Sequence, residues 1–180
     1  MKHRCYYFIA FLFFLTACQD FFIKDKEFSM KAIPYTGDEL KINGYYYKMD
    51  DTWSHVLIFY ANGVQFGGNS VIPNIEIEDR LRNPEYTKNL HDCLSCWGPY
   101  QIKENVLQFE FYDIFGHDWR TCIAHCKILN DTTFNIEKVT FSKTGKEVDV
   151  KKEGVGESFL GEYRFKQFNP KPDSTNSVVH

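Results

Sequence analysis

The stretch HVLIFYANGVQFGG, residues 55–68, gives the strongest indication of the fold. Val56–Tyr60 is a continuous run of apolar and aromatic residues, which favour β-strands. Asn62-Gly63 is the dipeptide that a two-residue type I′ turn requires, because both central residues of that turn take positive φ angles. Apolar residues then return on alternate positions. The stretch therefore predicts a β-hairpin.

The chain after this hairpin repeats the strand pattern. Leu107, Phe109 and Phe111 share one face of an expected strand, whereas Gln108 and Glu110 share the other. This period of two is typical of a half-buried strand. Similar stretches on either side predict about eight antiparallel strands.

A change of phase marks one of the later strands. In the stretch FNIEKVTF, residues 134–141, the apolar residues before Glu137-Lys138 and those after it fall on opposite faces. One extra residue in a strand produces such a change, so the sequence predicts a β-bulge near Glu137 and Lys138.

Between Arg80 and Trp97 the alternation disappears. Asn83 is a favourable N-cap residue, and Pro84 suits the first position of a helix. The residues that then recur at helical spacing are Tyr86, Leu90, Cys93, Leu94 and Trp97. They predict one amphipathic helix inserted midway through the strands.

Successive hairpins with short turns favour a mainly β fold, an antiparallel up-and-down barrel. Closing the sheet on itself removes exposed strand edges. We expect the barrel domain over residues 39–168. The polar, proline-bearing segment 169–180 is predicted to be a loose C-terminal tail.

The N-terminal segment has the build of a secretory signal peptide. Basic residues, including Lys2 and Arg4, precede the apolar stretch Tyr6–Ala17. A membrane span needs about 18 or more apolar residues, so this stretch is too short for a stable anchor. A signal peptide is therefore expected over residues 1–17.

The end of this segment, Leu15-Thr16-Ala17-Cys18, resembles the lipobox of bacterial lipoproteins. The resemblance implies that Cys18 is lipidated and attaches the chain to a membrane, with residues 18–38 as a tether. Gln19 follows the cysteine, and by the same resemblance the absence of Asp there favours the outer membrane, facing either the periplasm or the cell surface. The alternative is an ordinary secretory signal with a chance cysteine.

The rest of the chain looks like the lipocalin-like small lipoproteins of Gram-negative gut bacteria. The stretches that carry the resemblance are NGYYYKM (43–49), LIFYANG (57–63), CWGPYQIKENVLQFEF (96–111) and YRFKQFNPKPDSTN (163–176). The resemblance implies a barrel of about eight strands, which can hold one small ligand. Phe59, Phe109 and Phe111 are the candidates to line such a ligand site.

Four further cysteines, Cys93, Cys96, Cys122 and Cys126, allow three interpretations. In an exported protein an even number favours disulfides. Cys122 and Cys126 on one strand would lie about 13 Å apart, too far to pair with each other. If disulfides form, Cys122 and Cys126 are therefore each expected to pair with Cys93 or Cys96. The alternatives are a structural zinc site and free thiols. The C-x-x-C spacing of Cys93 and Cys96 also fits a thioredoxin-like redox motif, but that motif requires a βαβ context, whereas this pair falls at the end of the expected helix before a β-hairpin.

Composition and missing motifs restrict the function. Without residues 1–17 the chain has 19 basic and 24 acidic residues, and no basic stripe favours nucleic acid. No catalytic motif or phosphate loop appears, so neither an enzyme nor a cofactor is expected. The leading hypothesis is a membrane-anchored module that binds a small apolar or amphipathic ligand. The alternative is a structural or protein-interaction subunit of the cell envelope, its partner unknown, and an enzyme ranks last.

Overall fold

The computed structural model describes residues 25, 27–49, 51–67, 71–73, 76–115, 117–152 and 156–180, and these are mainly β. The strands are β1 (Gly44–Met49), β2 (Trp53–Phe59), β3 (Val64–Phe66), β4 (Val71–Pro73), β5 (Trp97–Lys103), β6 (Val106–Phe115), β7 (Asp118–Asn130), β8 (Thr133–Phe141) and β9 (Gly161–Gln167). The helical elements are α2 (Ile77–Arg82), α3 (Pro84–Asn89) and the 3-10 turns η2 (Leu94–Cys96) and η3 (Glu157–Phe159). In this part of the chain, no helix is long and apolar enough to cross a membrane.

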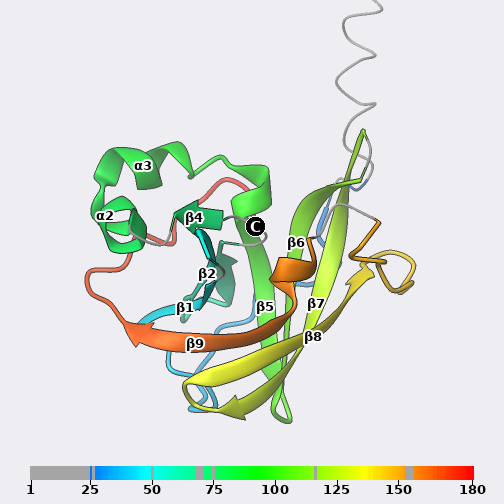
Figure 1. Ribbon diagram of the computed structural model, residues 1–180, viewed down its shortest axis with the longest axis horizontal. Helices are drawn as coiled ribbons and strands as arrows, with labels where there is room; N and C mark the ends of the chain where they lie inside the picture. Colours follow the sequence, from blue (N-terminus) through cyan, green and yellow to red (C-terminus); the bar gives the residue numbers. More distant parts are fainter. Residues whose placement is uncertain are drawn as a thin grey trace, which may run out of the picture.

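Eight of the strands form a closed antiparallel barrel (Figure 1). Their order around the barrel is β1, β9, β8, β7, β6, β5, β3 and β2, and the pairing of β1 with β2 closes it. β4 is an additional strand that pairs with the first residues of β2. The predicted mainly β barrel is confirmed.

The hairpin between β2 and β3 has a longer turn than the sequence predicted. The Tyr60 N–H donates to the Val64 carbonyl, and the Gly63 N–H donates to the Tyr60 carbonyl, both at 3.0 Å. These bonds enclose residues 61–63, with Gly63 at a φ of 83°. The prediction of a two-residue type I′ turn is wrong, because the loop also includes Ala61 and only Gly63 among its residues has a positive φ angle.

The predicted β-bulge is confirmed. His125 lies opposite Lys138 and Cys126 lies opposite Ile136, so Glu137 is the extra residue of β8. Its side chain is exposed. The bulge lets the apolar residues on both sides of it reach the barrel interior.

The single helix predicted between Asn83 and Trp97 is wrong. Asn83 does cap α3, accepting hydrogen bonds from the N–H groups of Glu85 and Tyr86, but α3 ends at Asn89. Trp97 already belongs to β5, where it lies opposite Phe66 of β3. The helical spacing arose because residues of several short elements face the same apolar cluster.

The barrel wall separates two hydrophobic cores. Inward-facing side chains such as Leu57 fill the inner core, whereas Val56 and Ile58 on the opposite face of β2 belong to an outer core. The helices α2 and α3 lie over this side of the barrel (Figure 1), and Ile77 and Leu81 of α2 contribute to the outer core. Burial on both faces accounts for the continuous apolar run in β2.

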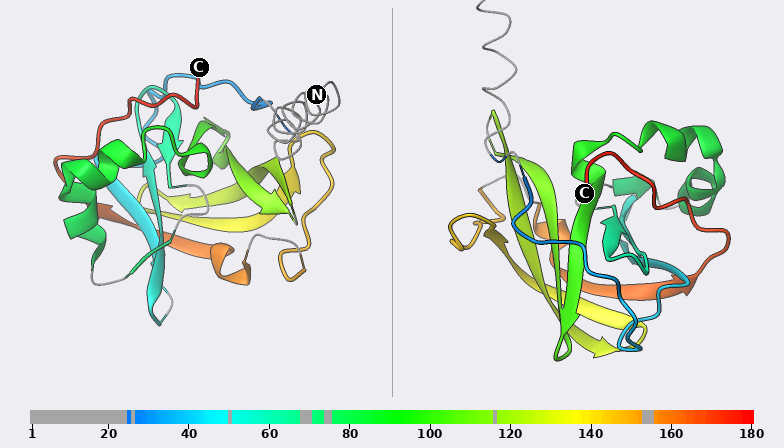
Figure 2. Two further views of the ribbon diagram at one scale, coloured as in Figure 1. Left: turned by 90° about the horizontal axis from the view of Figure 1, so that it is seen from above. Right: turned by 180° about the vertical axis from the view of Figure 1, so that it is seen from behind.

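Both terminal segments are docked on the barrel. The N-terminal strap, residues 27–35, follows the outside of the barrel (Figure 2). The C-terminal strap, residues 168–180, passes the helices, and its last residues lie near the N-terminal strap. Gln101 donates to the Lys31 carbonyl at 2.9 Å, and the Ser177 hydroxyl donates to Asp92 at 2.6 Å. Where the structure describes the expected tether and the expected loose tail, hydrogen bonds and apolar contacts hold both segments against the rest of the protein.

Candidate functional site

The predicted ligand-lining residues Phe59, Phe109 and Phe111 meet inside the barrel, each at most 1% exposed. The Phe59 ring is surrounded by four other aromatic rings. Their centroids lie at 4.9 Å (Tyr100), 5.8 Å (Tyr46), 6.0 Å (Phe134) and 6.2 Å (Phe109). The space that a ligand would need around Phe59 is occupied by the protein's own side chains.

The 3-10 turn η3 extends this packing. Phe159 is fully buried, and its ring centroid lies 5.3 Å from that of Phe111 and 6.2 Å from that of Phe109. Phe134 and Tyr163 stack beside it at 5.2 Å. Four hollows, bordered respectively by Pro84, Phe28, Ile33 and Phe168, include none of the residues Phe59, Phe109 and Phe111.

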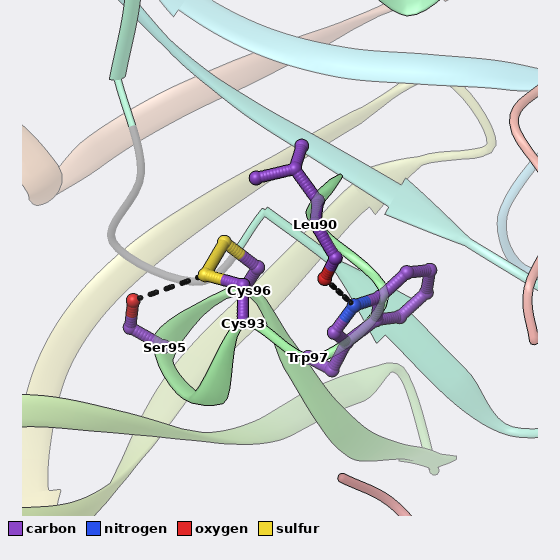
Figure 3. The surroundings of a disulfide bond; sticks show 5 residues. All are labelled: Leu90, Cys93, Ser95, Cys96 and Trp97. Carbon is purple, nitrogen blue, oxygen red and sulfur yellow. Dashed lines mark hydrogen bonds between the residues drawn. A yellow bond between two sulfur atoms is a disulfide. The ribbon is translucent and has the colours of Figure 1, made fainter. Parts of the chain in front are cut away.

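The cysteines pair differently from the expectation. Cys93 and Cys96 form a disulfide with each other, their Cα atoms 5.3 Å apart (Figure 3). Cys122 and Cys126 are free and buried. The expected bridges between the inserted segment and β7 were wrong, because Cys122 and Cys126 face the inner core, whereas Cys93 and Cys96 lie at the outer core.

The zinc interpretation lacks a ligand cluster in the described residues. No group of three or more His, Cys, Asp and Glu side chains there could hold a metal ion. The barrel wall separates the two cysteine pairs, so four thiolates do not converge.

Cys122 and Cys126 are expected to resist alkylation in the folded protein. Burial raises the pKa of both thiols, so the reactive thiolate is scarce. Peptide mass mapping after iodoacetamide treatment should find both unmodified in buffer and both modified in urea without a reductant. Cys93 and Cys96 should require a reductant. Alkylation of Cys122 or Cys126 under native conditions would contradict this placement.

A buried carboxylate holds the N-terminal strap. Glu110 of β6 is fully buried on the outer face of the barrel wall. It accepts hydrogen bonds from the Ser29 N–H at 3.0 Å, from the Met30 N–H at 2.7 Å and from the Ser29 hydroxyl at 3.1 and 3.2 Å. Phe28 packs beside it, with its ring centroid 4.8 Å from that of Tyr112.

Asp25 makes a second anchor just before the strap. Its carboxylate accepts from the Thr121 N–H of β7 at 2.9 Å and pairs with the Lys143 Nζ, also at 2.9 Å. Burial acts to raise the pKa of Asp25, but these donors together outweigh it and hold the pKa below its ordinary value.

We expect Asp25→Asn to lower the free energy of unfolding at neutral pH by about 1.5 kcal/mol, because hydrogen bonds to a charged acceptor are lost. The depressed folded-state pKa means that this contribution is complete above the unfolded-state pKa of about 3.9 and is lost as the pH falls through the folded value. Urea unfolding at a series of pH values should show the two proteins converging in acid. Asp38→Asn, at an exposed position, is the matched control. A difference that persists unchanged in acid would contradict this role.

The two straps enclose a surface groove, called here the terminal groove, with a volume of about 550 Å³. Its apolar lining residues are Phe28, Met30, Leu94, Tyr112, Val178 and Val179. Charged or titratable side chains at Glu27, Lys31, Asp92 and His180 also border it. Burial raises the pKa of Tyr112 to about 12, with smaller contributions from nearby carboxylates, so its hydroxyl is a neutral hydrogen-bonding group.

Lys171 fixes the other end of the C-terminal strap. Its Nζ donates to the carbonyls of Ile42 and Phe59 and lies 4.6 Å from the ring centroid of Tyr60. Burial lowers the pKa of Lys171 to about 8. These contacts explain why the strap follows the barrel instead of extending into solvent.

The site residues that sequence reasoning missed are Asp25, Glu110 and Lys171. The sequence around each of them is typical of exposed residues. Glu110 occupies the polar face of an expected strand, Asp25 lies in a charged stretch, and Lys171 lies in a proline-rich one. No local signal distinguishes such a residue from an exposed one. The expected lipidation site, Cys18, and the signal peptide lie outside the described residues.

A scan against protein-family models, a search of curated proteins and a search of solved structures each found no match to the chain. Function is therefore argued from the geometry.

Proposed function

We propose that the protein is a lipid-anchored interaction subunit of the bacterial cell envelope, held at the outer membrane through Cys18. The packed barrel interior carries this proposal. Phe59, Phe109 and Phe111 are buried against other rings, which supports a role for the barrel as a rigid scaffold. A partner would bind on the outer surface.

The docked strap keeps the proposed anchor short. Six residues, 19–24, lie between Cys18 and Asp25, and a chain of this length reaches at most about 24 Å. The barrel would therefore lie close to the membrane surface, with the segment around Asp25 nearest to it.

The terminal groove is the surface that best suits a protein partner. Both apolar and charged side chains line it, and protein interfaces combine the same two kinds of side chain, with apolar residues at the centre and polar residues at the rim. An extended segment of a partner with apolar side chains fits these surroundings.

Photo-crosslinking in intact cells tests the proposal. A photoreactive residue replaces Lys31 at the terminal groove or Lys127 on the exposed face of β7. We expect a discrete crosslinked product from position 31, none from position 127, and loss of the product in Cys18→Ala. Crosslinking from neither position, together with a monomer in native mass spectrometry, would overturn the proposal.

A small amphipathic ligand in the terminal groove is the second candidate. The groove volume of about 550 Å³ falls within the range of ligand sites. Native mass spectrometry of the exported protein would then show an adduct that denaturation removes and that Val178→Asp abolishes. Absence of an adduct in the unmodified protein would count against this candidate.

A further inference from the structure

The two cysteines of the Cys93–Cys96 disulfide differ in their exposure. Cys96 is 3% exposed within the outer core, whereas Cys93 is partly exposed. Leu94, between the two cysteines, lines the terminal groove, so the loop borders an open hollow. An incoming thiol can therefore approach Cys93 far more easily than Cys96.

The loop does not depend on the sulfur–sulfur bond for its shape. The cysteines are only three positions apart, and so short a cross-link removes little entropy from the unfolded chain. The Trp97 indole N–H donates to the Leu90 carbonyl at 2.7 Å (Figure 3), and the Gly67 N–H donates to the Cys96 carbonyl at 2.8 Å. These bonds would hold the two thiols side by side after reduction.

A hydroxyl group lies beside the sulfur of Cys93, the more exposed of the two cysteines. The Ser95 Oγ is 3.6 Å from the Cys93 Sγ, and in the disulfide only the hydroxyl has a proton to donate (Figure 3). A hydrogen bond to the charged form stabilises a thiolate, so Ser95 favours Cys93 as a leaving and attacking group.

We propose that Cys93–Cys96 is a redox-active disulfide that exchanges with a cysteine pair of an exported protein. A partner thiolate attacks the Cys93 Sγ, the Cys93–Cys96 bond breaks, and the electron pair passes to the Cys96 Sγ, which takes a proton. The second partner thiolate then attacks the first partner sulfur and releases Cys93 as a thiolate. The partner loses two electrons and becomes a disulfide, and the pair Cys93 and Cys96 becomes a dithiol. This exchange is independent of the proposed interaction at the groove.

Exchange with a synthetic peptide that carries a pair of cysteines tests the proposal. The full chain, purified in detergent, is mixed with the reduced peptide, quenched with acid, alkylated and mapped by mass. We expect new thiols at Cys93 and Cys96 in step with peptide oxidation, about tenfold faster than oxidation of the peptide by oxidised glutathione. The circular dichroism spectrum should not change.

Three variants separate an exchange site from a structural cross-link. Cys96→Ser should accumulate a mixed disulfide between Cys93 and glutathione, and Cys93→Ser should accumulate about tenfold less, because the remaining sulfur is buried. Ser95→Ala should slow exchange about threefold while leaving the unfolding midpoint in urea unchanged. Reduction of the disulfide only in urea, or equal trapping at both cysteines, would overturn the proposal.

Discussion

Replacing Phe59 with alanine is expected to lower the free energy of unfolding by about 4 kcal/mol, which urea denaturation would measure. The removed ring touches four other rings and is 1% exposed, so the surrounding side chains cannot refill the space without disturbing their own packing. Val106→Ala, at a residue 45% exposed, is the control and should change the stability by less than about 0.5 kcal/mol.

The same variant tests whether the barrel is a container. An apolar cavity made by removing a large side chain can bind a small apolar molecule. We expect benzene to raise the melting temperature of Phe59→Ala and to leave that of the unmodified protein unchanged. If Phe59→Ala cost less than about 1 kcal/mol, or if the unmodified protein bound benzene in its interior, the packed interior and the proposal that rests on it would be wrong.

Glu110→Gln is expected to release the N-terminal strap and to lower the free energy of unfolding by about 3 kcal/mol. The carboxylate accepts from the Ser29 N–H, the Met30 N–H and the Ser29 hydroxyl. An amide has one acceptor oxygen and would turn its own N–H toward one of these donors. The strap would then lose its charge-assisted bonds while its backbone donors could return to water.

Limited proteolysis and urea unfolding measure this effect together. Cleavage within residues 27–35 should become at least about tenfold faster in Glu110→Gln, because the strap opens locally before the barrel unfolds. Glu137→Gln is the matched control, since the same chemical change occurs at an exposed residue of the β8 bulge. Equal cleavage rates in the two variants would show that Glu110 does not hold the strap.

Much of the barrel could be predicted from local pattern. Alternation over residues 107–111 put Phe109 and Phe111 on one face, which is the inner face, and the phase change predicted a bulge near Glu137 and Lys138, where the extra residue is Glu137. The start of α3 at Asn83-Pro84 was equally local, because an N-cap and a proline act within one turn. The end of α3 could not be predicted from local sequence, because Trp97 pairs with Phe66 in the sheet in spite of its helical spacing from Tyr86 and Leu90.

The sequence by itself determined which stretches become strands, where most turns fall and where one helix begins. Those features depend on backbone sterics and on side chains a few positions apart. Only the tertiary structure decided that four aromatic rings pack around Phe59, that Cys93 pairs with Cys96, and that both terminal segments are docked. Glu110 and Ser29 are 81 positions apart, and the rings around Phe59 come from β1, β5, β6 and β8. Such partners become neighbours only when the sheet closes, so no local pattern could have named them.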